Sequence, residues 1–287
     1  REKRHLMSKK YLIGVDGSEQ SRVALGWGLA RATERGAEVE LLHVADDSFL
    51  SESVAFLSEA QQASEQMLTA ETEYARGLGF TGKITGSAVV GHPIAEIEEA
   101  SRHADLLILG EHGGTRLAGT YFGTRAEKAA ATAHCPVAVI PKEQPRPNAT
   151  VVVGIDGSDA SKKAIAFAAE EASFRGLPLV AVYAWMPPLT PGLEYLWSEE
   201  LVDSQRAAAE EAIAIGVAGL ASRYPDLEIR REIVQAPPVA ALVQAAEGAD
   251  LLVVGSRGRG GISRLLLGSV SHGVLQALPC PVVVTRS

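Results

Sequence analysis

Two sets of glycine and hydroxyl residues with the same spacing are the part of this chain best suited to chemistry. In each set a Gly is followed after two residues by a second Gly, and after nine more by a third Gly and a Thr or Ser. Glycine at the end of a strand lets the backbone turn without a side chain in the way. The free N–H groups of a following helix attract anions. The spacing predicts two phosphate-binding turns, although a duplicated turn kept for steric reasons would look the same. The two sets are Gly110, Gly113, Gly123 and Thr124, and Gly255, Gly258, Gly268 and Ser269.

Each half of the chain also carries an aspartate followed by Gly and Ser, namely Asp16 and Asp156. Two interpretations are open. The carboxylate can accept backbone N–H bonds in its turn while Ser18 or Ser158 caps the next helix, or it can face a ligand, and one residue can do both. Neither aspartate is convincing as a general base.

The two glycine-rich turns differ in charge. Between Gly110 and Gly123 the charges of Glu111 and Arg116 cancel. The turn from Gly255 to Gly268 contains three arginines, and a triphosphate should therefore prefer it. In the first half Arg125 stands where the second half has Val270, and it partly makes up for the lack of net positive charge in the first turn. The three arginines are Arg257, Arg259 and Arg264.

The elements that must position these residues follow from the apolar pattern. In the first half, strands are expected at 11–16, 39–44, 83–90, 104–110 and 137–140, and helices at 21–35, 51–76, from Pro93, and at 123–134. The order βαβαβαβαβ predicts an α/β fold: an open, five-stranded parallel sheet with helices on both faces, of Rossmann-like type. Continuous apolar runs such as 106–109 and 251–254 are typical of strands covered on both sides.

The second half repeats every element. Asp156 follows Asp16 by 140 residues, whereas Gly255 follows Gly110 by 145. Five residues have therefore been added between these points, most plausibly in the Pro-rich, aromatic segment 185–195. That segment is interpreted as a surface loop, with a lid or a subunit contact as alternatives. The predicted organisation is a disordered tail or cloning remnant at 1–9, a domain at 10–141, a linker at 142–149 and a domain at 150–287.

The composition narrows the possible partners. The 287 residues are 46% hydrophobic and carry a formal net charge of −8. This charge disfavours nucleic acid and anionic lipid as partners. No apolar run is long enough to span a bilayer, and the first residues lack the apolar segment of a signal peptide, so a cytoplasmic protein is expected. Cys135 and Cys280 have no CxxC spacing, and we interpret them as small buried residues rather than redox or metal groups.

In its two glycine-rich sets and the two aspartates, the chain resembles the universal stress protein family in its tandem, ATP-binding form. The resemblance covers nearly all of the chain after the tail. It implies an adenine nucleotide alpha hydrolase-like fold and one ATP site per domain, with bound Mg²⁺, between the carboxyl ends of strands one and four. The glycine-rich residues would hold phosphates and ribose, and Asp16 and Asp156 would lie at the adenosine end. The other implied binding positions are Val15, Val44, Arg125, Ile155, Ala184 and Val270.

The sequence lacks the usual marks of an ATP-hydrolysing enzyme. It has no GxxxxGK[ST] loop, no HExxH, no nucleophile elbow and no evident acidic pair for Mg²⁺. His112, in the first turn, is interpreted as an ordinary polar residue, and we assign no catalytic or metal-ligating residue. The leading hypothesis is a regulatory ATP-binding protein of the stress response. The alternatives are a slow ATPase or phosphotransferase, and an interaction protein whose glycine turns are empty.

The last strand of each half bears on assembly. Residues 137–140 and 282–285 are short apolar strands expected at a sheet edge, where they need cover. The resemblance implies that they pair with each other, making the two domains a pseudo-dimer. It also implies a homodimer of tandem chains, together with regulatory protein partners that the sequence does not identify.

Overall fold

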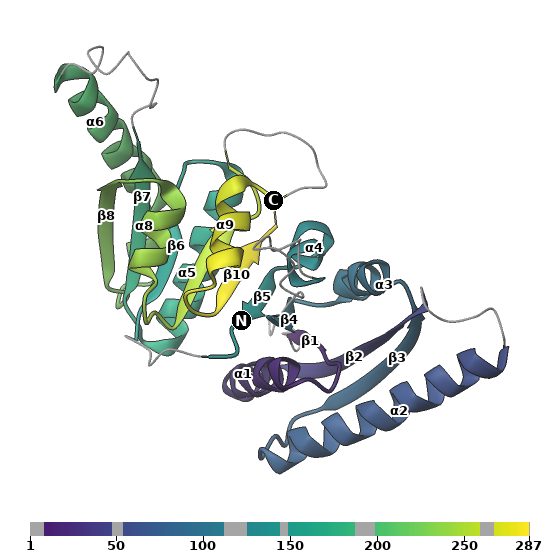
Figure 1. Cartoon of the computed structure of the whole chain (residues 1–287). Coiled ribbons are helices and arrows are strands. Elements are labelled where there is room, and N and C mark those ends of the chain that lie inside the picture. Colours follow the sequence, from purple (N-terminus) through teal and green to yellow (C-terminus); the bar gives the residue numbers. More distant parts are fainter. Residues whose placement is uncertain are drawn as a thin grey trace. The chain divides into compact units, whose positions relative to one another are not determined.

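A computed structural model describes residues 9–47, 54–111, 125–143, 149–186, 199–258 and 267–286 of the chain. The chain divides into two compact units, Arg1–Lys142 and Glu143–Ser287. Figure 1 labels the helices and strands of both. Each unit is built around its own parallel sheet, so each is described by itself.

The first unit has a parallel sheet with the strand order β3-β2-β1-β4-β5 among the residues described. Helices α1 and α2 pack on one face of this sheet, and α3 and α4 pack together on the other (Figure 1). A 3₁₀ turn, Ser101–His103, follows α3. The strands are β1 (Lys10–Gly14), β2 (Glu38–Asp46), β3 (Ile84–Gly91), β4 (Leu106–Gly110) and β5 (Val137–Ile140), and the helices are α1 (Glu19–Arg35), α2 (Val54–Gly77), α3 (Pro93–Ala100) and α4 (Arg125–Thr132).

The second unit repeats this plan with the strand order β8-β7-β6-β9-β10, again parallel. Helices α5 and α6 contact the sheet on one face, and α8 and α9 pack together on the other. The short helix α7 (Leu220–Arg223) is an addition that we did not predict. The strands are β6 (Val151–Gly154), β7 (Leu179–Trp185), β8 (Ile229–Gln235), β9 (Leu251–Gly255) and β10 (Val282–Thr285), and the main helices are α5 (Asp159–Arg175), α6 (Glu199–Gly216), α8 (Pro238–Ala245) and α9 (Ser269–Ala277).

The predicted fold class is confirmed, because both units are α/β with parallel sheets and helices on both faces. One boundary differs in a way that matters for the site. We expected the first strand to run from 11 to 16, but β1 ends at Gly14. Asp16 therefore lies in the turn beyond the strand, and Asp156 lies likewise beyond β6, which ends at Gly154.

The first helix of each unit has clear local signals at both ends. Ser18 and Ser158 cap α1 and α5, each side chain accepting a hydrogen bond from the backbone N–H three residues later at 3.1 Å. At the other end, Gly36 and Gly176 adopt the left-handed conformation, with φ of 62° and 65°. Glycine occupies this conformation without the steric cost of a side chain.

The strand order creates a switch point in each sheet. From β1 the chain moves outward to β2 and β3, and then returns to the other side of β1 as β4. Crevices in open α/β sheets form where the connections diverge in this way, at the carboxyl ends of the two central strands. That point lies between β1 and β4 in the first unit and between β6 and β9 in the second.

Several predictions concern residues outside the described ranges. These are Gly113, Gly123, Thr124, Arg116, Arg259, Arg264 and His112, together with most of the 1–9 tail, the middle of the 142–149 linker and most of the 185–195 segment. The pairing of β5 with β10 and the homodimer stay predictions.

Candidate functional site

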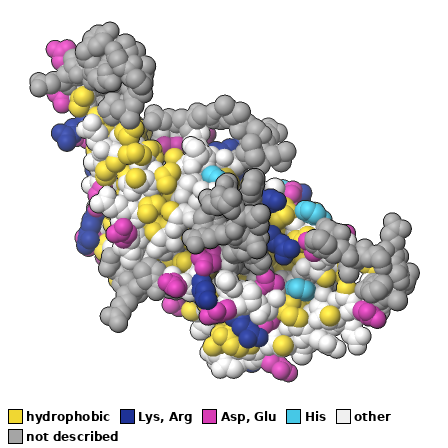
Figure 2. Space-filling model, viewed as in Figure 1, with side chains coloured by type: hydrophobic (Ala, Val, Ile, Leu, Met, Phe, Trp, Pro, Cys, Tyr) yellow, Lys and Arg dark blue, Asp and Glu magenta, His cyan; other side chains and the backbone are white. Residues whose placement is uncertain are grey.

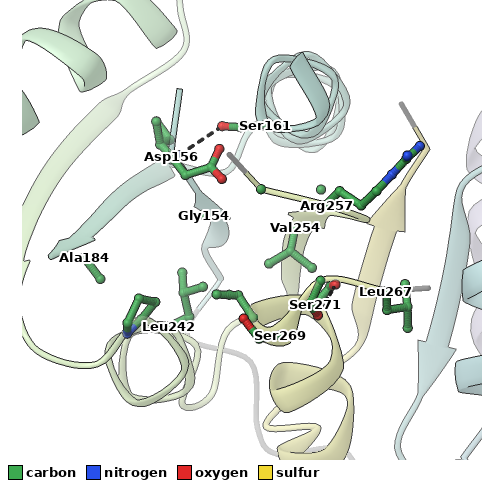
Figure 3. A pocket seen from close by; sticks show the side chains of 16 residues that line it. Gly154, Asp156, Ser161, Ala184, Leu242, Val254, Arg257, Leu267, Ser269 and Ser271 are labelled. Carbon is green, nitrogen blue, oxygen red and sulfur yellow. Dashed lines mark hydrogen bonds between the residues drawn. The ribbon is translucent and has the colours of Figure 1, made fainter. Parts of the chain in front are cut away.

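A cavity of about 510 Å³ lies at the carboxyl ends of β6 and β9 in the second unit (Figure 3). The β6–α5 turn, the end of β7, the start of α8, the turn after β9 and the first turn of α9 all contribute to its lining. All eight residues predicted for this unit line it. They are Ile155, Asp156, Ala184, Gly255, Gly258, Gly268, Ser269 and Val270.

The two carboxylate oxygens of Asp156 have different surroundings. Oδ1 accepts a hydrogen bond from the Ser158 N–H at 2.9 Å, which closes the turn before α5. Oδ2 lies against Gly258, where an added Cβ would be 2.6 Å away. In Figure 3 the carboxylate points across the cavity toward the segment that carries Arg257. Asp156 therefore takes part in its own turn and also reaches the glycine-rich turn after β9.

The start of α9 is the part of the cavity suited to an anion. Gly268 is its N-cap, with φ of −66° and ψ of 157°, and it offers no side chain to the first-turn N–H groups. The first turn contains no acidic residue. Arg257, on the neighbouring turn, also lines the cavity. Uncapped helix N–H groups suit a phosphate. Arg257 adds a positive charge to the lining, and in Figure 3 its side chain extends away from the start of α9.

Another part of the lining is apolar. Leu242, from α8, and Val254, from β9, line the cavity, and Ala184 does so at the end of β7. Figure 3 shows Ala184 on one side of the cavity and Arg257 on the other. The cavity thus has an apolar side and a cationic side, an arrangement suited to a ligand with a flat apolar ring and an anionic group.

The glycines of the second set have different structural roles. A Cβ on Gly255 would lie 2.8 Å from the carbonyl carbon of Ala160, in the backbone of α5. Gly110 meets the same obstacle in α1, with the Gln20 oxygen at 2.5 Å. We expected glycine here to let the backbone turn. The structure shows a different reason: the first turn of a helix packs so closely against the end of the strand that no side chain fits between them.

Gly268 differs from Gly255, because nothing in the described protein requires a glycine there. A Cβ at this position would meet its nearest neighbour, the Cα of Arg257, at 3.4 Å, and the backbone φ is ordinary for any residue. The space that the missing side chain leaves belongs to the cavity lining. A bound group can therefore use space that the protein itself does not need.

A smaller cavity, about 80 Å³, occupies the equivalent place in the first unit. Five of the predicted residues line it, and the other three fall outside the described ranges. Asp16 repeats the turn of Asp156, its Oδ1 accepting from the Ser18 N–H at 3.0 Å. The five are Val15, Asp16, Val44, Gly110 and Arg125.

Sequence reasoning missed two polar residues at the first cavity: one in its lining and one that pairs with a lining residue. His43 lines the cavity, and its Nδ1 lies 2.8 Å from the Val15 oxygen, which links β2 to the turn after β1. Asp46 accepts a hydrogen bond from Nη2 of Arg125 at 3.2 Å. The available signal for Asp46 was its place at the carboxyl end of strand two, two residues after Val44.

Three observations concern metal, membrane and surface charge. Within them no group of three or more His, Cys, Asp or Glu side chains could hold a metal ion. In the described part of the chain, no helix is both long and apolar enough to cross a membrane. On the face drawn in Figure 2, the Lys and Arg side chains are interspersed with Asp and Glu side chains.

Cys135 and Cys280 are both buried, and neither forms a disulfide in the described part of the chain. Burial raises the pKa of the Cys280 thiol to about 12. The thiol therefore stays protonated at neutral pH, and in this form it is a poor nucleophile.

Comparison with known proteins gives a consistent result over both units. The profile of the Universal stress protein family matches residues 7–141 and 147–286. Universal stress protein Rv2005c of Mycobacterium tuberculosis is 35% identical over 290 residues, which cover 96% of each chain. Universal stress protein Rv2623 of the same organism is 33% identical, over 96% of this chain and 95% of its own.

The fold is also similar to a solved structure. The crystal structure of a universal stress protein from Archaeoglobus fulgidus matches 96% of both chains with a TM-score of 0.71 and 21% identity. This similarity concerns the fold alone.

Proposed function

The chain belongs to the universal stress protein family, and from this premise we propose that it binds ATP in the cavity of each unit and acts as a nucleotide-dependent regulator of the stress response. Nucleotide occupancy would order the turns around the cavity and change a surface that a partner protein contacts. In this proposal chains also pair as homodimers. Bound Mg²⁺ would arrive with the nucleotide.

One observation carries the proposal: the second cavity joins an uncapped helix N-terminus and Arg257 to an apolar side bounded by Ala184 and Leu242. A phosphate chain suits the first part and an adenine ring the second. The volume of about 510 Å³ lies within the range of roughly 300–1,000 Å³ typical of small-molecule sites.

A regulator is favoured over an enzyme by the residues around the cavity. Asp156 is the one acidic side chain in the described lining, and its Oδ1 already accepts a hydrogen bond in the turn. A phosphoryl-transfer site needs groups that hold the metal and orient the attacking water. The alternative, a slow ATPase or phosphotransferase, would show turnover that depends on Asp156 and on Mg²⁺.

The direct test is the nucleotide content of purified protein after heat denaturation, combined with calorimetric titration of ATP and Mg²⁺. We expect bound ATP, and we expect Gly258→Glu to abolish binding in the second unit because its carboxylate would enter the cavity beside Asp156. Gln235→Glu is the matched control, since it adds the same charge in the same unit at an exposed site outside the cavity lining.

Two results would contradict the proposal. Protein that carries no nucleotide and gains no thermal stability from millimolar ATP with Mg²⁺ would show that the glycine turns are empty. Binding that survives Gly258→Glu with unchanged stoichiometry would place the ligand elsewhere.

A further inference from the structure

An ion pair beside the first cavity has no counterpart at the equivalent positions of the second unit. In the first unit the positions are occupied by Asp46 and Arg125, which form an ion pair. The corresponding residues of the second unit are Met186 and Val270, both apolar. Both partners of the ion pair are thus replaced by apolar residues in the second unit.

The ion pair joins the lining of the first cavity to a carboxylate outside that lining. Asp46 is the last residue of β2, and Arg125 is the first residue of α4, on the opposite face of the sheet from α1. Nη2 of Arg125 donates to Oδ2 of Asp46 at 3.2 Å. Arg125 itself lines the cavity, as does Val44, two residues before Asp46. The guanidinium of Arg125 is thus held toward the end of β2.

A ligand phosphate would need this same guanidinium. Arg125 opens the helix whose N-terminus faces the cavity, where an arginine can bind phosphate oxygens through two parallel hydrogen bonds. The side chains of Arg125 and Asp46 are 48% and 24% exposed. Pairs that water reaches are weak and can exchange partners. When Arg125 turns to a phosphate, the Asp46 carboxylate loses that partner and stays near the anion.

We infer that Asp46 competes with ligand phosphates for Arg125, so that the first cavity binds polyphosphate nucleotides more weakly than Arg125 alone would permit. The inference rests on the proposed function. It implies that the two sites differ in their affinity for polyphosphate nucleotides, because Asp46 lowers the affinity of the first. The second cavity has no such restraint at the equivalent positions, Met186 and Val270.

The test uses full-length protein with Gly258→Glu, which leaves the first site alone to be titrated with ATP or with adenosine. Adding Asp46→Asn should tighten ATP binding by about fivefold, the effect of losing a half-exposed ion pair. Adenosine has no phosphate for Arg125, so its affinity should not change. A purely structural effect of Asp46 would alter both ligands alike.

Two controls complete the design. Arg125→Ala should remove the gain from Asp46→Asn, because the carboxylate is proposed to act only through that guanidinium. Met186→Asn, tested on the second site in otherwise unchanged protein, should leave ATP affinity as it was.

The outcomes separate this inference from the proposed function. An ATP affinity that Asp46→Asn leaves unchanged would overturn the inference while leaving the nucleotide site intact. Equal tightening of ATP and adenosine would overturn it as well. If the Gly258→Glu protein binds no ATP with or without Asp46→Asn, the first unit has no nucleotide site, and both statements fail for it.

Discussion

The carboxylate of Asp156 occupies the space that a side chain on Gly258 would need, since a Cβ there would lie 2.6 Å from Asp156 Oδ2. The other oxygen, Oδ1, is held by the Ser158 N–H at 2.9 Å. One aspartate thereby connects the turn after β6 with the turn after β9. The position of the Asp156 carboxylate therefore depends on the absence of a side chain at Gly258.

Gly258→Ala should weaken ATP binding in the second unit by about tenfold, the loss of roughly one hydrogen bond to a charged group. The methyl group would push the carboxylate of Asp156 from its place while leaving the fold intact, because the clash is with the end of a flexible side chain. Isothermal titration calorimetry measures the affinity, and circular dichroism checks the fold.

A double-mutant cycle shows whether the effect passes through Asp156. In an Asp156→Ala background the clash is absent, so Gly258→Ala should then cost little. Equal costs with and without Asp156 would mean that Gly258 contacts the ligand independently.

Asp156→Ala and Asp156→Asn separate the two roles of this residue. Alanine removes the acceptor of the Ser158 N–H and should lower the free energy of unfolding by about 1 kcal/mol. Asparagine keeps an acceptor there and should retain most of that stability. It should still bind ATP about tenfold more weakly, because an NH2 donor takes the place of the acceptor Oδ2. Urea unfolding and titration give the two quantities. If the Asn variant binds ATP as tightly as the parent, Asp156 has only its structural role in the turn.

Gly255→Ala should lower the free energy of unfolding of the second unit by about 1–3 kcal/mol, the usual cost of overpacking. Its Cβ would meet backbone atoms of Ala160 at 2.8 and 3.0 Å, and these cannot move without shifting α5. Gly26→Ala is the matched control, because a Cβ there meets nothing within 4 Å. A helical Gly→Ala change should be neutral or stabilising. Similar urea midpoints for both variants would refute the packing role.

Gly268→Ser should affect stability and binding differently. Serine is at least as good an N-cap as glycine, so the free energy of unfolding should stay within about 0.5 kcal/mol of the parent. The hydroxymethyl group would take space in the cavity and a first-turn N–H, so ATP binding should weaken. Thermal unfolding with and without ATP measures both effects. A variant that ATP stabilises as well as the parent would show that this space is not used by the ligand.

Raising the pH should destabilise the second unit through Cys280. Burial raises the pKa of its thiol from 9.0 to about 12. The unfolded chain then loses this proton before the folded chain does, so the stability contribution is present below pH 9 and falls between about pH 9 and 12, by up to about 1.4 kcal/mol per pH unit. Urea unfolding at pH 8 and pH 10 should show a smaller decrease for Cys280→Ala than for the parent. If the parent and Cys280→Ala lose the same amount of stability between the two pH values, the effect comes from other groups.

The sequence alone determined the repeat, the order of the strands and main helices, and the helix caps at Ser18 and Ser158. These features rest on local chemistry: apolar periodicity, turn residues and N-cap side chains act within a few residues of each other. The strand order then brought Asp156 and Gly258 to one edge of the sheet, as parallel strands require. The end of β1 was missed by two residues, because an apolar run does not show where pairing with the neighbouring strand stops.

Only the tertiary structure decided what each of these residues does. Gly255, Gly258 and Gly268 are alike in sequence, but they face the backbone of α5, the carboxylate of Asp156 and the cavity, respectively. The pairing of Asp46 with Arg125 likewise joins residues far apart in the chain. Such contacts depend on how helices and strands pack in three dimensions, and local periodicity carries no information about them.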